Sequence, residues 1–206
     1  MISIVLVDDH PLAVKGIGAW LQGTKSNGES RFTIVGTAGN LEEAGSLLEK
    51  LDPLPDIIIL DISLGAEDGL DFIPVLKEIC TKRKAPLPGI LVCSMYEDPF
   101  LIQRAVDAGA AAYVSKSEES GEIIAAIEAV MDGQTYINDK YRIHNPELWT
   151  FLSRRENEIV SMVRRSMNNQ QIAEQLGLSI RTVENHLARI YVKTGALSRR
   201  DLFDLH

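Results

Sequence analysis

The chain has 206 residues, of which 45% are hydrophobic and 24% charged, and its formal net charge is −8. This length allows one or two domains that each bury a core, and the composition is typical of a globular protein. The longest apolar runs fall short of the roughly 20 residues that cross a bilayer, and the first residues lack the basic and apolar stretches of a secretion signal, so we expect a cytoplasmic protein without a membrane partner.

The charge is unevenly distributed along the chain. Residues 150–206 carry nine Lys and Arg against six Asp and Glu, a net charge of +3, which leaves −11 for residues 1–149. This asymmetry indicates an acidic domain joined to a mildly basic one, which favours a nucleic-acid partner only weakly. Cys80 and Cys93 lie in apolar surroundings without CxxC spacing, so we expect two reduced packing residues.

Short apolar runs alternate with helical patterns over residues 1–131. The runs are nearly continuous in apolar character, as in strands buried on both faces of a parallel sheet. They are Ile4–Val7, Phe32–Val35, Ile57–Leu60, Ile90–Cys93 and Ala111–Val114. Helices are expected at 11–21, 40–51, 69–80, 99–108 and 120–131. The alternation predicts a doubly wound α/β domain with a five-stranded parallel sheet.

Local signals support several of these helices and the boundary that follows them. Pro11 and Pro99 suit first-turn positions, and Asn40 with Glu43 predicts a capping box. Residues 132–148 are polar and show no clear period, which predicts a linker. A small all-α domain is expected over 149–206.

Polar side chains follow four of the predicted strands. Asp8 and Asp9 follow the first strand, Asp61 the third, Ser94 the fourth and Lys116 the fifth. In open α/β sheets, ligands bind outside the carboxyl ends of the strands. We therefore expect three carboxylates, a hydroxyl and an ammonium at one edge of the sheet.

Three carboxylates that lie together demand a cation. Oxygen ligands suit a hard ion, and Mg²⁺ takes a few carboxylates, keeps some water and binds phosphate. A lysine and a hydroxyl nearby suit phosphate oxygens, and a carboxylate so placed is able to accept a phosphoryl group. Each residue taken alone is more often a turn, cap or surface residue, so the prediction rests on their convergence.

Residues 1–131 resemble a response-regulator receiver domain. The resemblance is carried by "VDDH" at 7–10, "ILD" at 59–61 with Gly69 following, "VCS" at 92–94 and "AGAAAYVSK" at 108–116. It implies a flavodoxin-like fold in which Asp61 is the phosphoacceptor and a histidine kinase is the donor.

The resemblance also implies a role for each surrounding residue. Asp9 would bind Mg²⁺ directly, Asp8 would act through water, and the backbone carbonyl of Ser63 would complete the protein ligands. The residues implied to hold the phosphoryl oxygens are Ser94 and Lys116. Tyr113 would be an aromatic switch that turns inward when Ser94 moves, and its alternative role is that of a packing aromatic.

One position departs from the receiver pattern. The family usually has proline four residues after the acceptor aspartate, where this chain has Gly65 in "DISLGAEDG". Glycine widens the backbone choices of the loop, and Glu67 and Asp68 add negative charge beside it. We expect the departure to bear on phosphorylation rate and phosphate lifetime more than on the chemistry.

The C-terminal region carries helix-turn-helix spacing. Ser153 with Glu156 predicts a capping box that opens a helix at 152–160. Further along, Ala173 allows close helix crossing, Gly177 makes the turn and Val183 packs the second helix.

The second helix of this motif, over 179–193, has two distinct faces. Ser179 is expected to cap it, and Val183, Leu187 and Ile190 repeat at helical spacing and should face the core. On the other face, asparagine suits bidentate contact with adenine and arginine suits guanine or phosphate, whereas Glu184 would repel phosphate. The predicted DNA-contact residues are Arg181, Thr182, Asn185, His186, Arg189 and Lys193. The alternative is a solvated polar face.

Residues 149–201 resemble the LuxR/NarL-type helix-turn-helix module. The motifs are "LSRRENEIV", "NNQQIAEQLGLS" and "TVENHLARIYVKTGALSRRDL". Ser166 stands where the family usually has glycine, and Thr194 where it usually has leucine. Family members commonly dimerise through the last helix, which here would begin near Ser198 and be short, since the chain stops at His206. The whole chain thus resembles a NarL/FixJ-type regulator, which implies a phosphorylation-controlled transcription factor that forms a homodimer.

Two other classes of protein deserve comparison. An aspartyl-phosphate phosphatase usually has a second aspartate two residues after the nucleophile, where this chain has Ser63, so we expect no enzyme. A protein-binding regulator that no longer meets DNA would lack basic outward residues, whereas Arg181, Arg189 and Lys193 remain. The sequence does not name the cognate kinase, the signal, the promoters or the sign of regulation, and it does not choose between the receiver and the last helix as the dimer surface.

Overall fold

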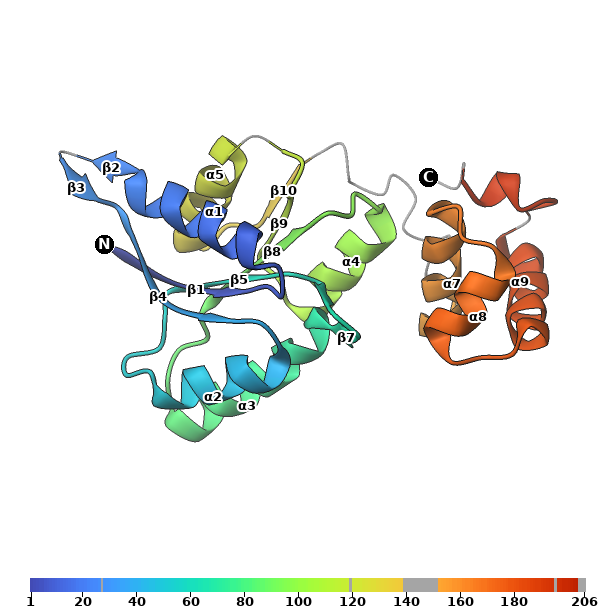
Figure 1. Cartoon of the computed structure of the whole chain (residues 1–206), viewed down its shortest axis with the longest axis horizontal. Helices are drawn as coiled ribbons and strands as arrows, with labels where there is room; N and C mark the ends of the chain where they lie inside the picture. Colours follow the sequence, from blue (N-terminus) through green and yellow to red (C-terminus); the bar gives the residue numbers. More distant parts are fainter. Residues whose placement is uncertain (27, 119, 139–151, 195, 204–206) are drawn as a thin grey trace. The chain divides into compact units, whose positions relative to one another are not determined.

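The computed structural model describes residues 1–26, 28–118, 120–138, 152–194 and 196–203. These residues form two compact units, one comprising residues 1–97 and 104–138 and the other the residues from 152 onward together with residues 98–103. The elements of each unit are labelled in Figure 1, and each unit is described by itself. Within the described ranges, no helix has both the length and the apolar character needed to cross a bilayer.

The first unit is built on a six-stranded parallel sheet. Its strands lie in the order β10-β9-β8-β5-β1-β4, and they are β1 (Ile2–Val7), β4 (Phe32–Ala38), β5 (Ile57–Leu60), β8 (Gly89–Ser94), β9 (Ala112–Ser115) and β10 (Tyr136–Ile137). The predicted doubly wound α/β fold is confirmed, and all five predicted strands are present. The predicted number of strands was one short.

The additional strand, β10, extends the sheet beside β9. Tyr136 N donates to Ala111 O at 2.9 Å, and the Tyr136 hydroxyl donates to Glu122 of the neighbouring helix. This hydrogen bond, with burial, raises the pKa of Tyr136 to about 12. Two residues are too short to show a strand pattern. They fall in the predicted linker, of which residues 139–148 lie outside the described residues.

Helices cover both faces of the sheet. They are α1 (Pro11–Gly23), α2 (Leu41–Lys50), α3 (Phe72–Arg83), α4 (Pro99–Ala108) and α5 (Ser120–Met131). Figure 1 shows α1 and α5 on one face and α2 and α3 on the other. The start of α3 falls three residues later than predicted, because residues 69–71 form the 3-10 turn η1 (Gly69–Asp71).

The predicted helix starts are largely confirmed. Pro11 is in the first turn of α1, and Asn40 caps α2 by accepting from Glu43 N at 2.8 Å. The Glu43 carboxylate accepts from Gly39 N rather than from Asn40 N, also at 2.8 Å. The reciprocal bond of the predicted capping box therefore falls one residue earlier.

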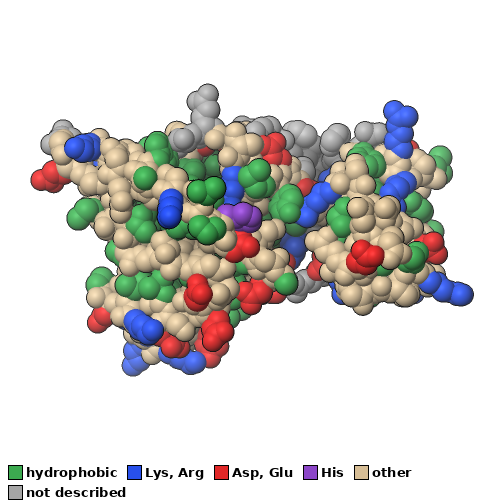
Figure 2. All heavy atoms as spheres, viewed as in Figure 1, with side chains coloured by type: hydrophobic (Ala, Val, Ile, Leu, Met, Phe, Trp, Pro, Cys, Tyr) green, Lys and Arg blue, Asp and Glu red, His purple; other side chains and the backbone are tan. Residues whose placement is uncertain are grey.

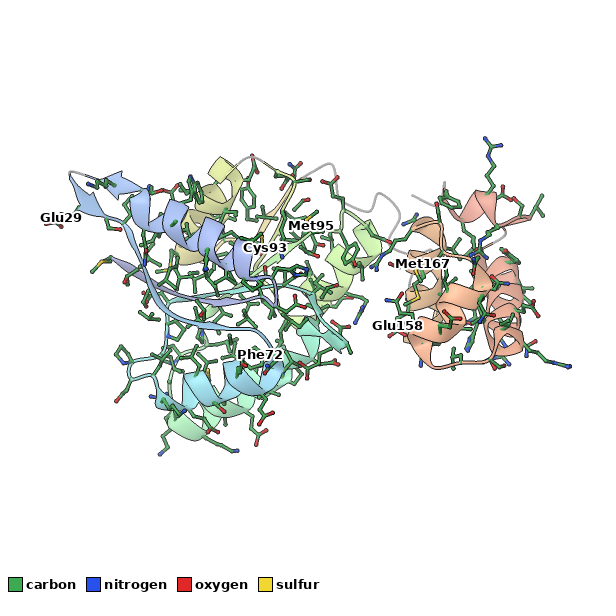
Figure 3. The ribbon with its side chains drawn as sticks, in the orientation of Figure 1. Glu29, Phe72, Cys93, Met95, Glu158 and Met167 are labelled. Atoms are coloured by element: carbon green, nitrogen blue, oxygen red, sulfur yellow. The ribbon has the colours of Figure 1, made fainter. Side chains whose placement is uncertain are left out.

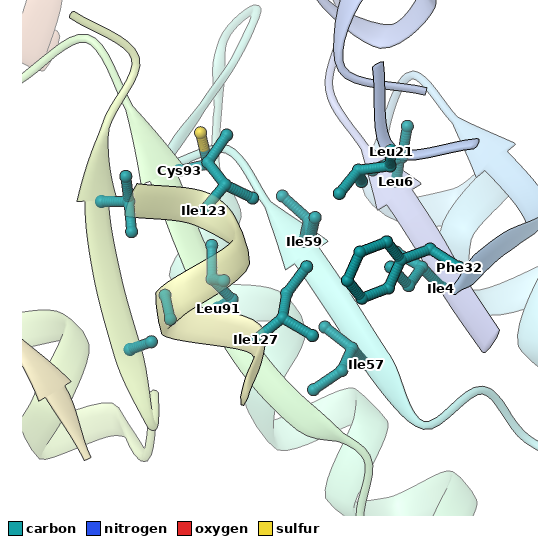
Figure 4. Close-up of a cluster of buried hydrophobic side chains, with 13 residues drawn as sticks. Ile4, Leu6, Leu21, Phe32, Ile57, Ile59, Leu91, Cys93, Ile123 and Ile127 are labelled. Carbon is teal, nitrogen blue, oxygen red and sulfur yellow. The ribbon is translucent and has the colours of Figure 1, made fainter. Parts of the chain in front are cut away.

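The core beneath α1 and α5 is formed by alternate residues of the central strands. Ile57 and Ile59 of β5 pack with Ile123 and Ile127 of α5 in one buried cluster, seen in Figure 4. Cys93 belongs to this cluster, and burial raises the pKa of its thiol to about 12. Cys80 and Cys93 are both free and buried, which confirms their predicted packing role.

The second unit is helical. It contains α7 (Arg154–Arg164), α8 (Asn169–Leu176), α9 (Ile180–Thr194) and the 3-10 turn η3 (Arg200–Leu202). The predicted capping box of Ser153 and Glu156 is present. Gly177 ends α8 in the left-handed conformation with φ +63°, and Ser179 caps α9 by accepting from Thr182 N at 3.1 Å.

The helix-turn-helix core forms as expected from the sequence. Ala173 on α8 and Val183, Leu187 and Ile190 on α9 are all buried. Ser166, which replaces the usual glycine, adopts a left-handed φ of +61°, a conformation that glycine takes at the lowest cost. Beyond Ser198 the described residues contain only η3, and residues 204–206 lie outside them.

Candidate functional site

Three aspartates lie together at the carboxyl ends of β1 and β5. Asp8 and Asp9 follow β1, Asp61 follows β5, and these two strands are neighbours in the sheet. The register pairs Val7 with Leu60, and Asp61 N donates to Val7 O at 2.9 Å. The strand pairing therefore places the three carboxylates at the same level of one edge.

Lys116, which follows β9, reaches two of these carboxylates. Its Nζ lies 2.5 Å from Asp8 Oδ2 and 2.7 Å from Asp61 Oδ2. Burial favours a lower lysine pKa, but the hydrogen bonds with Asp61 and Asp8 outweigh it and raise the pKa of Lys116. The charged ammonium of Lys116, which follows β9, thus connects the residues that follow β1 and β5.

The donor set fits a hard divalent cation. Three carboxylates and one ammonium have a formal net charge of −2. Asp8, Asp9, His10 and Asp61 each offer one ligand atom, and these atoms lie within 4.8 Å of one another. Asp9 Oδ1 is buried and accepts no hydrogen bond from the described residues, because its contact with His10 Nδ1, 2.7 Å away, lacks hydrogen-bond geometry. Burying such an oxygen is unfavourable, and a cation with oxygen ligands such as Mg²⁺ would relieve this cost.

His10 belongs to this cluster, although the sequence reading gave it no role. The backbone N–H of His10 donates to Asp8 Oδ1 at 2.8 Å. The imidazole Nδ1 of His10 lies 2.7 Å from Asp9 Oδ1. Its imidazole is 68% exposed, and Figure 2 shows a histidine beside acidic side chains on the visible face of the first unit. Its place directly after two aspartates in "VDDH" is the signal that could have identified it.

Ser94 and Tyr113 are buried side chains on adjacent strands. Figure 3 labels Cys93 and Met95, the residues on either side of Ser94 at the end of β8. Lys116 N donates to Ser94 O at 2.8 Å, so Ser94 lies at the same edge as Lys116. The Tyr113 side chain points inward and is fully buried.

The loop after Asp61 forms a small antiparallel hairpin. Its strands are β6 (Ser63–Leu64) and β7 (Glu67–Asp68), which pair Ser63 with Asp68. Ser63 N donates to Asp61 Oδ1 at 3.2 Å. The part expected of the Ser63 carbonyl as a metal ligand stays a prediction.

The predicted DNA-contact residues of α9 differ in their exposure and in the partners of their side chains. The side chains of Arg181, Asn185 and Arg189 are exposed, and no described residue forms a hydrogen bond or ion pair with them. Thr182 Oγ1 lies within hydrogen-bonding distance of Ser179 Oγ, at 2.7 Å. His186 is half-buried, and its Nδ1 has no hydrogen-bond partner in the described part of the chain.

Lys193 already has a partner within its own unit. Its Nζ lies 2.6 Å from Glu156 Oε2, and the Glu156 side chain is only 4% exposed. Glu156 also accepts from Ser153 N at 2.7 Å as part of the capping box. The end of α9 is therefore tied to the start of α7, a contact that the sequence reading did not anticipate.

Comparisons with known proteins agree for both units. The model of the response regulator receiver domain matches residues 4–128, and that of the bacterial regulatory proteins of the luxR family matches residues 150–206. The transcriptional regulatory protein LiaR of Bacillus subtilis is 28% identical over 209 residues, which cover 97% of this chain and 93% of LiaR. A putative transcriptional regulator of Pseudomonas aeruginosa is 32% identical over 212 residues, or 99% of this chain and 96% of the relative.

A solved structure shows a similar fold along the whole chain. RcsB from Salmonella enterica serovar Typhimurium, bound to promoter rprA in the presence of phosphomimetic BeF3⁻, superposes with a TM-score of 0.64 at 20% identity. The superposition covers 99% of this chain and 97% of RcsB.

Proposed function

Because the chain belongs to the response regulators that join a receiver domain to a LuxR-type DNA-binding domain, we propose that it accepts a phosphoryl group on Asp61 and controls transcription through α9. Its family consists of transcription regulators and not enzymes, which sets the phosphatase alternative aside. The observation that best supports the proposal is the Lys116 ammonium, bonded to Asp8 and Asp61 at the end of the sheet.

The proposed reaction is attack by an Asp61 carboxylate oxygen on the phosphorus of the donor, whose leaving group departs. Lys116 and the Ser94 hydroxyl would hold the phosphoryl oxygens, since Ser94 ends β8 and Lys116 follows the adjacent strand β9 at this edge. Asp8, Asp9, Asp61 and the Ser63 carbonyl would hold Mg²⁺, which when bound neutralises charge on the phosphoryl group.

Intact mass after incubation with a small phosphodonor tests this part of the proposal. We expect the wild-type chain to gain one phosphoryl group in Mg²⁺ and the Asp61→Asn variant to gain none. Asp56→Asn serves as the control, because Asp56 precedes β5 and bonds to Ser3 at the opposite end of that strand. Modification of Asp61→Asn, or modification unaffected by a chelator, contradicts the proposal.

The exposed face of α9 is the proposed DNA contact. The fold relative RcsB is bound to a promoter, and Arg181, Asn185 and Arg189 are exposed side chains of the matching domain. Thr182, His186 and Lys193 complete the proposed set, although Lys193 has the competing partner Glu156.

DNA binding at several salt concentrations separates the proposed contacts by type. Arg181→Ala should weaken binding to every sequence and flatten the salt dependence. Asn185→Ala should relax the choice at one base pair by about 1–3 kcal/mol if the contact is bidentate. An Asn185→Ala protein with unchanged sequence preference contradicts a base-reading role.

The partners follow from these two activities. A receiver domain receives its phosphoryl group from a histidine kinase, and we propose that phosphorylation also promotes a homodimer on DNA. We propose a cytoplasmic location, because the matched luxR family comprises bacterial regulatory proteins and bacterial DNA lies in the cytoplasm.

A further inference from the structure

Gly65 forms the turn of the hairpin that follows the proposed phosphoacceptor. Its φ is +60°, in the left-handed region, where a β-carbon is unfavourable and which proline cannot reach, because its ring fixes φ near −65°. The Gly65 N–H donates to Asp9 Oδ2 at 2.9 Å, and proline has no N–H to donate. Glycine at this position thus permits both a turn and a hydrogen bond that proline would remove.

The two oxygens of the Asp9 carboxylate differ in their hydrogen bonds. Oδ2 accepts a hydrogen bond from the hairpin, whereas Oδ1 is buried and has no contact of hydrogen-bond geometry with any described residue. Oδ1 is also the oxygen that faces His10 Nδ1, at 2.7 Å. The hairpin therefore fixes the Asp9 carboxylate through one oxygen, and the other oxygen faces His10, which belongs to the same cluster as Asp8 and Asp61.

The hairpin is itself anchored on two sides. Glu67 Oε2 accepts from Leu41 N, the first residue of α2, at 3.1 Å. Asp68 Oδ2 lies 2.6 Å from an Arg104 guanidinium nitrogen on α4. Because both ends of β7 are held by neighbouring helices, Gly65 has a defined position from which to hold Asp9.

We propose that Gly65 is a positioning residue for Mg²⁺, whose N–H orients the Asp9 carboxylate for the cation. The inference rests on the proposed function, in which Asp9 is a metal ligand. Groups that orient metal ligands typically change metal affinity by 10–100-fold when they are lost.

Calorimetric titration of the full chain with Mg²⁺ alone tests the proposal. Gly65→Pro, which loses the N–H and the turn, should raise the Mg²⁺ Kd by about 10-fold or more. Gly65→Asn keeps the N–H and tolerates the left-handed region, so its Kd should stay within about twofold of wild type. Gly28→Pro is the matched control, because Gly28 lies in another turn with φ +88°, and its Kd should equal that of wild type.

Each outcome decides between positioning and a general effect on folding. A wild-type Kd for Gly65→Pro, or an equal loss for Gly65→Asn and Gly28→Pro, overturns the proposal. If Gly65→Pro does not fold, amide exchange of Gly65 in wild type and Asp9→Ala replaces it. We expect slow exchange in wild type and faster exchange in Asp9→Ala, and equal rates overturn the proposal. A wild-type chain without Mg²⁺ affinity would instead refute the cofactor part of the proposed function, and the amide exchange would still test the hydrogen bond.

Discussion

Lys193 illustrates how a residue on an exposed helix face can be held by its own domain. The periodicity of α9 predicts an outward lysine that contacts phosphate, and its side chain is indeed 37% exposed. Its ammonium nevertheless bonds to the buried carboxylate of Glu156, 37 residues earlier in the chain. Burial favours a raised pKa for Glu156, but the hydrogen bonds from Lys193 and Ser153 prevail and lower it. Lys193 therefore stabilises the domain whether or not it meets DNA.

The lowered pKa of Glu156 gives a prediction about pH. A carboxylate whose pKa is lower in the folded state stabilises the fold above its ordinary pKa of about 4.3, and the stabilisation is lost as pH falls through the folded value. At pH 7, Lys193→Ala should lower the free energy of unfolding of the second unit by about 1–3 kcal/mol. The effect should shrink once the pH falls below the folded pKa of Glu156, where the wild-type carboxylate is protonated.

Calorimetric unfolding of the full chain at two pH values provides the measurement. Arg189→Ala is the control on the same helix, because Arg189 is exposed and has no partner among the described residues. We expect Arg189→Ala to leave stability unchanged and to weaken DNA binding. Equal destabilisation by both variants contradicts a specific role for the Lys193–Glu156 pair.

At the scale of elements, the β6–β7 hairpin joins the acceptor loop to α4. The Asp68 and Arg104 side chains are 27% and 17% exposed, and their oxygen and nitrogen lie 2.6 Å apart. Asp68 Oδ1 also accepts from Leu70 N at 3.0 Å. One carboxylate thus links β7, the turn η1 and α4.

We expect Arg104→Gln to lower the free energy of unfolding by about 1 kcal/mol, because a partly buried ion pair is screened less than an exposed one. Lys82→Gln is the matched control, since Lys82 pairs with Glu78 on α3 where both side chains are mostly exposed. Urea unfolding at low and high salt should show a loss of stability for Arg104→Gln that largely persists at high salt, and no measurable loss for Lys82→Gln. An unchanged midpoint for Arg104→Gln contradicts a stabilising link.

The elements that the sequence predicts well are those with a clear period. The five longer strands and the helices between them carry continuous apolar runs or helical spacing, and the polar residues after the strands follow from strand ends alone. The β6–β7 hairpin and β10 have two residues per strand, too few for a period. Gly65 stood out only as a departure from a pattern, because its φ of +60° and its bond to Asp9 depend on tertiary structure.

At the scale of the whole molecule, phosphorylation of Asp61 must alter the structure of the first unit in order to change DNA binding by the second. Tyr96 connects the two proposed switch residues through its backbone. Tyr96 N donates to Ser94 Oγ at 3.4 Å, a long hydrogen bond, whereas Tyr113 donates its hydroxyl to Tyr96 O at 2.6 Å. A movement of Ser94 toward a phosphoryl group would therefore act on the segment that also holds Tyr113.

We predict that phosphorylation shifts an existing equilibrium of the first unit through Ser94, Tyr96 and Tyr113. A phosphoryl group can shift that equilibrium only by its different affinity for the two states, so a change of a few kcal/mol is enough for a large effect. Ser94→Ala loses the hydroxyl that would meet the phosphoryl oxygens, and Tyr113→Phe loses the bond to Tyr96 O while keeping the ring. Both should still accept phosphate on Asp61 yet gain less DNA affinity than wild type.

DNA affinity with and without phosphorylation, at one salt concentration, is the measurement, and intact mass verifies that each variant is modified. Tyr136→Phe is the matched control, because it removes a tyrosine hydroxyl that bonds to Glu122 rather than to the segment after β8. It should respond as wild type does. The new surface formed after the shift would either pair two receivers or release the DNA-binding helices, and the oligomeric state of phosphorylated wild type distinguishes these routes. A full response from both Ser94→Ala and Tyr113→Phe would place the switch elsewhere in the first unit.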